Sequence, residues 1–257
     1  MEPDSILRVC DLKISFGEFC VVKNISFSIE KASTLAIVGE SGSGKSVTAM
    51  AILGLLPAAA NVQGKVQFED MQLLSATPKQ LRKIRGNNIA MVFQEPMTSL
   101  NPVFTIGEQI EESVLLHRNV SKKVARAMTR KAMEEVGLNP DRYGAYPHEF
   151  SGGMLQRAMI AMALVCEPTL LIADEPTTAL DATTSRQLMQ TLVEIRERRG
   201  MSMLFISHDL HLVASIADVV CVMREGRIVE KGSVRAVMES PSHPYTQALL
   251  DCIPSLR

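Results

Sequence analysis

Four short, continuous apolar runs dominate the hydrophobic pattern of the chain, and runs of this length are typical of buried strands. They lie at Thr34–Val38, Ile89–Phe93, Thr169–Ala173 and Met201–Ile206. Apolar helical patterns follow the first run at Val47–Leu56 and precede the third at Ala158–Cys166. Buried strands that alternate with helices predict an α/β fold with a mostly parallel sheet.

Alternation of apolar and polar residues predicts half-exposed antiparallel strands as well. The alternation is strict from Asn24 to Ile29, and Gly17-Glu18 forms a turn before that strand. The expected strands are Leu7–Phe16, Val21–Ile29 and Gly64–Phe68, together with a closing hairpin formed by Asp218–Met223 and Arg227–Val229. The first strands predict an N-terminal antiparallel β subdomain.

Between the second and third apolar runs the pattern becomes helical and polar. It extends from Thr105 to Val136, and Gly137-Leu138-Asn139-Pro140 then stops the helix. Since this region has no buried-strand pattern, we interpret residues 96–166 as an inserted helical subdomain. A basic helix is expected at Ser75–Arg85, and a turn that leads into a short helix is expected within Ser242–Leu250.

Composition and charge narrow the function classes. Of the 257 residues, 46% are hydrophobic and 21% are charged, and the net charge of −1 offers no field that would attract nucleic acid or an acidic membrane. The longest apolar run, Thr48–Ala60, is too short to span a bilayer, and no secretory signal is visible. Five scattered cysteines without a C-x-x-C pair indicate reduced, mostly buried thiols in a cytoplasmic protein.

The segment Gly39-Glu40-Ser41-Gly42-Ser43-Gly44-Lys45-Ser46 matches the P-loop motif G-x-x-x-x-G-K-[ST]. A predicted strand precedes it and a predicted helix follows it, which is the context that the motif requires. Glycines let the backbone curl with its N–H groups inward, and a helix N-terminus adds donors for an anion. We expect Lys45 to reach the β- and γ-phosphates and Ser46 to offer its hydroxyl to Mg²⁺.

Polar residues stand directly after the other buried strands. Gln94 ends the second strand, at a sheet edge where ligands bind. Asp174 and Glu175 follow the third strand, and adjacent acids there are costly unless they face a cation or water. We expect the first to hold Mg²⁺ and the second to polarise a water. His208 follows the fourth strand and is a candidate to contact the γ-phosphate, although a lone histidine is usually structural.

A second glycine turn precedes the helix at Ala158–Cys166. Ser151 is a natural N-cap, and Gly152 and Gly153 after it form a second anion-binding turn. An ordinary capped helix has the same local sequence. Phe16 stands before the turn Gly17-Glu18 and is either a core residue or a ring that stacks on a purine. The local sequence leaves both alternatives open.

Taken together, these residues resemble the nucleotide-binding subunits of ABC transporters over nearly the whole chain. Six elements of that family occur in the expected order. They are Walker A at Gly39–Ser46, the Q-loop at Gln94, the signature at Ser151-Gly152-Gly153, Walker B at Leu170–Glu175, the D-loop at Ala179-Leu180-Asp181 and the switch histidine at His208. Phe16 falls where the family places its adenine-stacking aromatic residue.

A narrower resemblance points to the peptide and nickel importer branch, which serves di- and oligopeptides, glutathione and nickel chelates. The stretch Met91–Pro102 and the tail His243-Pro244-Tyr245-Thr246 are similar to that branch. So is Met154, which stands where the common signature has glutamine. Some members carry a cysteine-rich tail. In the tail of this chain Cys252 is the only cysteine, so no iron–sulfur cluster is expected.

The resemblance implies a RecA-like P-loop NTPase that binds ATP and Mg²⁺ and hydrolyses ATP. The ATP-binding residues would be Phe16, Gly39, Glu40, Ser41, Gly42, Ser43, Gly44, Lys45, Ser46, Gln94, Ser151, Gly152, Gly153 and Asp181. Ser46, Gln94 and Asp174 would hold the metal, and Glu175 and His208 would be catalytic. The chain would form one ABC ATPase domain, with a nucleotide-binding core at 1–95 and 167–235, a helical subdomain at 96–166 and a tail at 236–257.

The resemblance also implies partners. The chain would energise an importer of peptides or nickel from the cytoplasmic face of the inner membrane, as a peripheral subunit. It would act with a second ATP-binding subunit, in a homo- or heterodimer, with two integral membrane permease subunits and, through these, with an extracytoplasmic solute-binding protein. In a head-to-tail dimer, each ATP would lie between the P-loop of one subunit and Ser151-Gly152-Gly153 of the other. The sequence does not identify the solute, because this subunit is not expected to touch it.

Two other classes of protein contain P-loops. Soluble ABC-type ATPases of translation or DNA maintenance usually carry two cassettes or a long coiled-coil insertion, whereas this chain has one cassette, no extended heptads and no basic surplus. A P-loop kinase of a small molecule would not need the turn Ser151-Gly152-Gly153. The transporter class is therefore favoured, and no nucleic-acid partner is expected.

Overall fold

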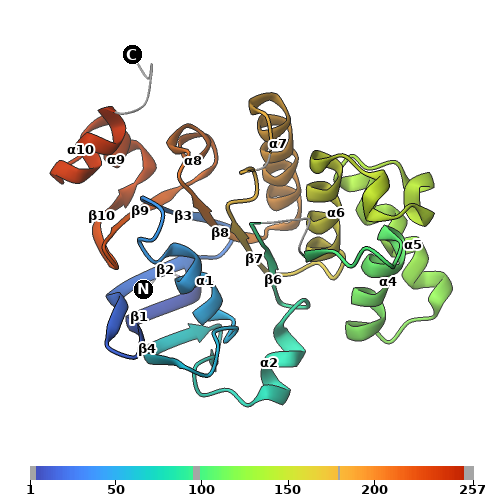
Figure 1. Ribbon diagram of the computed structural model, residues 1–257, viewed down its shortest axis with the longest axis horizontal. Coiled ribbons are helices and arrows are strands. Elements are labelled where there is room, and N and C mark those ends of the chain that lie inside the picture. Colours follow the sequence, from blue (N-terminus) through green and yellow to red (C-terminus); the bar gives the residue numbers. More distant parts are fainter. Residues whose placement is uncertain (1–3, 95–98, 179, 252–257) are drawn as a thin grey trace. The chain divides into compact units, whose positions relative to one another are not determined.

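The computed structural model describes residues 4–94, 99–178 and 180–251 (Figure 1). Pro96, Ala179 and Cys252, which enter the predictions above, lie outside these ranges. The chain divides into two compact units, of which the first consists of Met1–Leu81 and Ser202–Arg257 and the second of Arg82–Met201. The boundary near residue 81 falls within helix α2 (Pro78–Ile84). The division into core, helical subdomain and tail expected from the sequence stays a prediction.

The antiparallel part of the first unit is a four-stranded sheet in the order β2-β1-β4-β5. Its strands are β1 (Ser5–Phe16), β2 (Phe19–Glu30), β4 (Ala60–Phe68) and β5 (Met71–Gln72). Ile25, Phe27 and Ile29 of β2 are buried and the residues between them are less so, as the alternating pattern predicts. The antiparallel subdomain is confirmed, and each of its long strands begins before the residue that the pattern indicates.

The other strands of the first unit are mostly parallel. The order is β10-β9-β3-β8, in which β3 (Thr34–Val38) runs parallel to both β8 (Ser202–Ser207) and β9 (Val219–Arg224). Every residue of β3 and β8 is buried, which explains why both appear in the sequence as continuous apolar runs. Strand β10 (Arg227–Ser233) pairs antiparallel with β9, so the predicted hairpin is confirmed.

Among the described residues of this unit, helices α1, α8, α9 and α10 accompany the strands (Figure 1). Helix α1 (Lys45–Ile52) follows the P-loop and ends four residues before the predicted end at Leu56. Helices α8 (Leu210–Ile216), α9 (Val234–Glu239) and α10 (Pro244–Asp251) lie later in the chain. The sequence pattern indicated only the last of these three, because α8 and α9 are too short for a clear helical period.

The second unit combines two parallel strands with a group of helices. Strands β6 (Ile89–Val92) and β7 (Leu170–Asp174) pair with Val92 opposite Ala173. The helices of the predicted helical region are α4 (Ile106–His117), α5 (Lys122–Glu135), η1 (Pro140–Gly144), η2 (Pro147–Glu149) and α6 (Gly152–Leu164). Helices α4, α5 and α6 pack against one another (Figure 1).

One expectation for this unit was wrong, and one helix has no counterpart among the elements expected from the sequence. The segment Thr105–Val136 was treated as one helical stretch, but it forms two helices because Ser121 caps a new helix start at Lys122. The sequence analysis also missed helix α7 (Ala182–Arg199), whose buried residues Ser185, Leu188, Met189, Leu192 and Ile195 stand in a largely polar sequence. A narrow apolar stripe of this kind is easily masked by surrounding charge.

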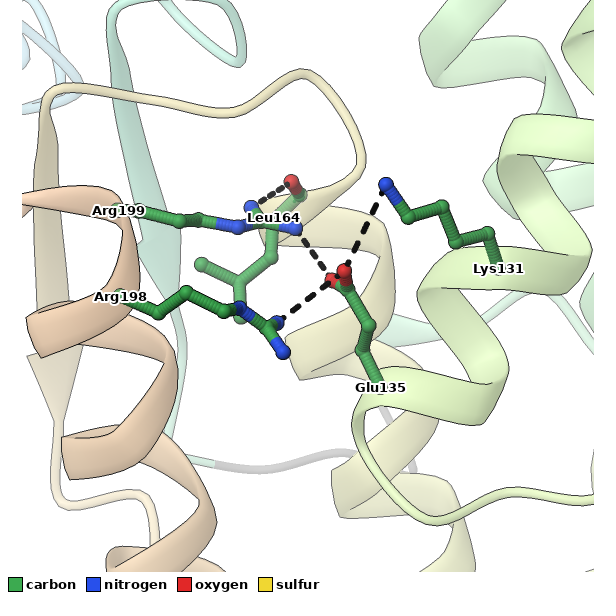
Figure 2. Close-up of polar contacts among 5 residues, drawn as sticks. All are labelled: Lys131, Glu135, Leu164, Arg198 and Arg199. Atoms are coloured by element: carbon green, nitrogen blue, oxygen red, sulfur yellow. Dashed lines mark hydrogen bonds and ion pairs between the residues drawn. The ribbon is translucent and has the colours of Figure 1, made fainter.

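Glu135 at the end of α5 joins that helix to α7 (Figure 2). One carboxylate oxygen lies 3.2 Å from Arg198, and the other accepts a hydrogen bond from Arg199. Arg199 also donates to the carbonyl oxygen of Leu164, at the last residue of α6, over 2.9 Å. The carboxylate and the two guanidinium groups therefore tie three helices of the second unit together.

The remaining global expectations concern cysteines and membrane spans. Cys166 and Cys221 are buried, whereas Cys10 and Cys20 are partly exposed, and all four are free thiols. The expectation of mostly buried thiols therefore holds for two of these four. In the part of the chain that the structure describes, no helix combines the length and apolar character that a membrane crossing requires.

Candidate functional site

The predicted site residues divide between the two units. The first unit contains Phe16, the P-loop and His208, and the second contains Gln94, Ser151-Gly152-Gly153, Asp174, Glu175 and Asp181. The P-loop connects the carboxyl end of β3 to α1. A Cβ atom on Gly39, whose φ is +151°, would lie 2.0 Å from the carbonyl oxygen of Met223. Only glycine therefore allows the loop to leave β3 this close to the end of β9.

Lys45 is the first residue of α1 and is only 4% exposed. Its ammonium group donates hydrogen bonds to the carbonyl oxygens of Gly39 at 2.8 Å and Glu40 at 2.9 Å. The loop thus curls around the positive charge and fixes its position. The hydroxyl oxygen of Ser43 is buried and has no hydrogen-bond partner among the described residues. Such an orphaned polar atom is usually satisfied by a ligand or a water.

Phe16 and His208 belong to the same unit as this loop. Phe16 is the last residue of β1 and is partly exposed, opposite Phe19 in the hairpin. Val22 of the next strand lies against Gly44, so this end of the hairpin is beside the P-loop. His208 is exposed and directly follows β8, where Ser207 pairs with Val38. The loops that start at Gly39 and His208 therefore leave adjacent strands at the same sheet edge.

The second unit brings Gln94 and Glu175 together. Gln94 follows β6 closely and Glu175 directly follows β7, and the Gln94 amide donates to the Glu175 carboxylate at 3.3 Å. Glu175 has a φ of +46°, a conformation that is strained for a residue with a side chain and is common at functional sites. Asp174 is the last residue of β7 and is 5% exposed. The surroundings of the two acids thus differ: Asp174 is buried, whereas Glu175 is partly exposed and lies beside the Gln94 amide.

The glycine turn and the D-loop residue also meet. Ser151 caps α6 by accepting a hydrogen bond from the N–H of Met154, as predicted. A Cβ atom on Gly153 would lie 3.1 Å from the Thr184 methyl group, so the turn lies against the start of α7. Asp181 caps α7 through the N–H groups of Thr183 and Thr184, both at 3.0 Å. A further hydrogen bond from the Thr184 hydroxyl is the main cause that lowers the pKa of Asp181.

These residues have the chemistry that ATP and Mg²⁺ require. The curled backbone and Lys45 suit phosphate groups, and the oxygen atoms of Ser46, Gln94 and Asp174 are the hard donors that Mg²⁺ prefers. Within residues 4–94, 99–178 and 180–251, no three His, Cys, Asp or Glu side chains form a metal site of their own.

Three residues that no sequence pattern indicated contact predicted site residues within their own units. The Tyr245 hydroxyl accepts a hydrogen bond from the N–H of Glu40 at 3.2 Å, and the Arg224 guanidinium lies 4.8 Å from the centre of the Tyr245 ring. Thr178 donates its hydroxyl to the Glu175 carboxylate at 2.9 Å. Tyr245 had been noted only as part of a tail motif, and a contact across 205 residues leaves no local signal.

Comparison with known families decides the assignment. The family model described as ABC transporter matches residues 22–178, which is more than half of the chain. The chain belongs to the ABC transporter family. A second model, described as the C-terminal region of oligopeptide/dipeptide transporters, matches residues 229–257. The resemblance inferred from the motifs is thus confirmed, both for the family and for the peptide transporter branch.

Curated relatives and solved structures of this family agree with the fold. The glutathione import ATP-binding protein GsiA of Escherichia coli (strain K12) and that of Shigella flexneri are each 46% identical over 272 residues, which cover 100% of this chain and 43% of the relative. The chain thus spans less than half the length of these relatives.

Two solved structures each have a TM-score of 0.80. The first is the ATP-binding cassette MJ0796 bound to ADP and Pi, which is 25% identical, with 89% of this chain and 99% of that chain covered. The second is cbiO1 from Clostridium perfringens, part of the ABC transporter complex cbiONQ, which is 28% identical, with 92% of each chain covered. The predicted fold class, an ABC-type α/β cassette with an antiparallel β subdomain, is confirmed.

Proposed function

We propose that the chain binds and hydrolyses ATP to energise an ABC importer. The observation that carries this proposal is the P-loop, in which Lys45 is buried inside a curled backbone at the carboxyl end of β3. Such a curl with an ammonium group inside suits the β- and γ-phosphates of a nucleotide. The bound ADP and Pi of the similar cassette MJ0796 support the same reaction.

Each part of the site has a proposed task in binding. Phe16 stacks on the adenine ring from the hairpin end beside Gly44. The N–H groups of the P-loop and Lys45 bind the phosphates, and the buried hydroxyl of Ser43 gains a partner. Ser46, Gln94 and Asp174 would hold Mg²⁺, which when bound neutralises phosphate charge.

Hydrolysis needs a positioned water and a stabilised γ-phosphate. Glu175 accepts a hydrogen bond from the attacking water and thereby orients it toward the γ-phosphorus. The new P–O bond forms as the bond to the bridging oxygen breaks, and the proton of the water passes to the Glu175 carboxylate and from there to solvent, which yields ADP and phosphate. His208 follows β8, the strand paired with β3, and donates a hydrogen bond to a γ-phosphate oxygen.

A dimer completes the site in this proposal. A γ-phosphate held by Lys45 still presents anionic oxygens, and the capped N-terminus of α6 at Ser151-Gly152-Gly153 of a second subunit suits them. Asp181 stands beside that turn through Thr184 and would belong to the same dimer face. Closure of the dimer excludes water other than the reacting one.

The proposed partners are two permease subunits and, through them, an extracytoplasmic solute-binding protein. In this proposal the chain is a peripheral subunit at the cytoplasmic face of the inner membrane. The match of residues 229–257 to the peptide transporter C-terminal region supports a peptide as the solute. The glutathione import relatives agree with that class.

Reconstitution tests this function. The chain is co-purified with candidate permease subunits from the same organism and placed in vesicles with the binding protein. We expect ATP hydrolysis that rises with the loaded binding protein, and ATP-dependent uptake of glutathione or short peptides but not of nickel chelates. Lys45→Ala serves as the inactive control. Hydrolysis without any dependence on membrane partners would instead favour a soluble ABC-type ATPase.

A further inference from the structure

The start of the C-terminal helix α10 is fixed by a carboxylate of β10. Glu230 accepts hydrogen bonds from the N–H of Ser242 at 2.7 Å, the Ser242 hydroxyl at 2.8 Å and the N–H of His243 at 3.1 Å. Burial opposes ionisation, but these hydrogen bonds outweigh it and lower the pKa of Glu230 to about 2. The Nδ1 atom of His243 in turn accepts from the N–H of Tyr245 at 3.1 Å. The tail thus presents Tyr245 at a defined place.

Tyr245 reaches the P-loop from this helix. Its side chain is buried, with 7% of the residue exposed, and Arg224 lies over its ring. A hollow of about 100 Å³ is lined by residues 40–43 of the P-loop together with Arg224, Glu225 and Tyr245. The 3.2 Å hydrogen bond from the N–H of Glu40 to the Tyr245 hydroxyl joins two of these lining residues.

That hydrogen bond acts on the same peptide group that holds Lys45. The peptide between Gly39 and Glu40 is planar, so its carbonyl and its N–H turn together. The N–H of this peptide donates to Tyr245, and its carbonyl oxygen accepts from the Lys45 ammonium at 2.8 Å. Fixing the N–H of Glu40 therefore also fixes the carbonyl oxygen of Gly39, which accepts the hydrogen bond from Lys45. The tail and the phosphate-binding lysine are linked through one rigid group.

We propose that Tyr245 is a positioning residue for ATP binding, which fixes the Gly39–Glu40 peptide plane and through it the ammonium group of Lys45. This inference rests on the proposed function of the P-loop. It assigns a task to the segment matched by the peptide transporter C-terminal model, which contains both Glu230 and Tyr245. In that segment, Glu230 orients the tail and Tyr245 contacts the nucleotide loop.

The test is Tyr245→Phe in the full chain, which removes the hydroxyl and keeps the ring under Arg224. Binding of ATP with Mg²⁺ is measured by calorimetry, and the unfolding midpoint is measured in parallel. We expect the Kd for ATP to rise about 3- to 10-fold, the range of one hydrogen bond, with little change in the midpoint. Glu230→Gln, which weakens the anchor of the tail, should raise Kd in the same direction by a smaller factor.

Tyr143→Phe is the matched control, because Tyr143 is similarly buried at 8% exposure and donates its hydroxyl to Glu111 in the other unit. It should leave the Kd unchanged. Equal Kd values for wild type and Tyr245→Phe would overturn the proposal, as would an equal loss in Tyr143→Phe. If Tyr245→Phe does not fold, an unchanged Kd in Glu230→Gln overturns it. A wild-type chain that binds no ATP would overturn the proposed function as well.

Discussion

The side-chain amide of Gln94 donates a hydrogen bond to the carboxylate of Glu175 at 3.3 Å. The two residues stand at the ends of the paired strands β6 and β7, and Thr178 donates to the same carboxylate oxygen at 2.9 Å. Gln94, a residue proposed to hold Mg²⁺, and Glu175, the residue proposed to orient the water, thus share one hydrogen-bond network. A displacement of Gln94 therefore changes the surroundings of the Glu175 carboxylate.

We predict that Glu175→Gln binds ATP normally but hydrolyses it about 10²–10⁴ times more slowly, because an amide is a poor acceptor for the proton of the attacking water. The variant should accumulate as an ATP-bound closed dimer. Single-turnover hydrolysis and size-exclusion chromatography with ATP measure the two effects.

Asp174→Asn is the comparison for this experiment, since Asp174 is buried and is the proposed Mg²⁺ residue. It should weaken binding of ATP with Mg²⁺ rather than trap the dimer. A trapped dimer in Asp174→Asn, and none in Glu175→Gln, would mean that the two acids have the opposite roles.

Gln94→Ala should reduce transport and the stimulation of hydrolysis by membrane partners more than it weakens ATP binding. The reason is that the amide reaches Glu175 from the end of β6, directly before the helical subdomain expected at residues 96–166, so we expect it to connect that subdomain with the hydrolytic residue. The measurement is hydrolysis in reconstituted vesicles with and without the loaded binding protein. Equal stimulation of wild type and variant would exclude Gln94 from the coupling between transport and hydrolysis.

Lys45→Ala should leave the chain folded and weaken ATP binding by at least about 10²-fold, since charge-assisted contacts to two phosphates are lost. Calorimetry measures the affinity, and circular dichroism checks the fold. Affinity and hydrolysis near the wild-type values in a folded variant would rule out the proposed P-loop role.

Glu135→Ala should lower the free energy of unfolding by roughly 2–4 kcal/mol, because Arg198 and the largely buried Arg199 lose their shared carboxylate (Figure 2). Urea unfolding measures the change. Lys131→Ala is the control, because its ammonium is 4.0 Å from Glu135 and its side chain is 70% exposed, so the change should stay within about 0.5 kcal/mol. Equal effects of the two variants would contradict the importance of the arginine pairs.

The buried parallel strands were predictable because burial on both faces leaves a continuous apolar run. The pattern placed β3 at Thr34–Val38 without error and β8 within one residue at each end. Helix α7 escaped because its buried stripe is narrow and its outer face is charged. The single pattern over Thr105–Val136 hid two helices, since a cap at Ser121 interrupts the backbone but not the polar composition.

The candidate site was predictable where its residues follow strands. Gln94, Asp174 and Glu175 are placed by the ends of β6 and β7, so their proximity follows from parallel pairing. Tyr245 is different, because its place depends on the path of the chain through β9, β10 and α9 and on the anchor at Glu230. No local pattern encodes that path.

The pairing of β3 has a consequence for synthesis of the chain. Thr34 pairs with Met203 and Leu35 with Val219, so the strand that leads into the P-loop gains both neighbours only after residue 219 has been made. Pairings between such distant segments form slowly. The ribosome-bound chain therefore carries the complete P-loop motif long before it has a folded phosphate cradle. A nascent chain that ends before Met203 should consequently bind no nucleotide.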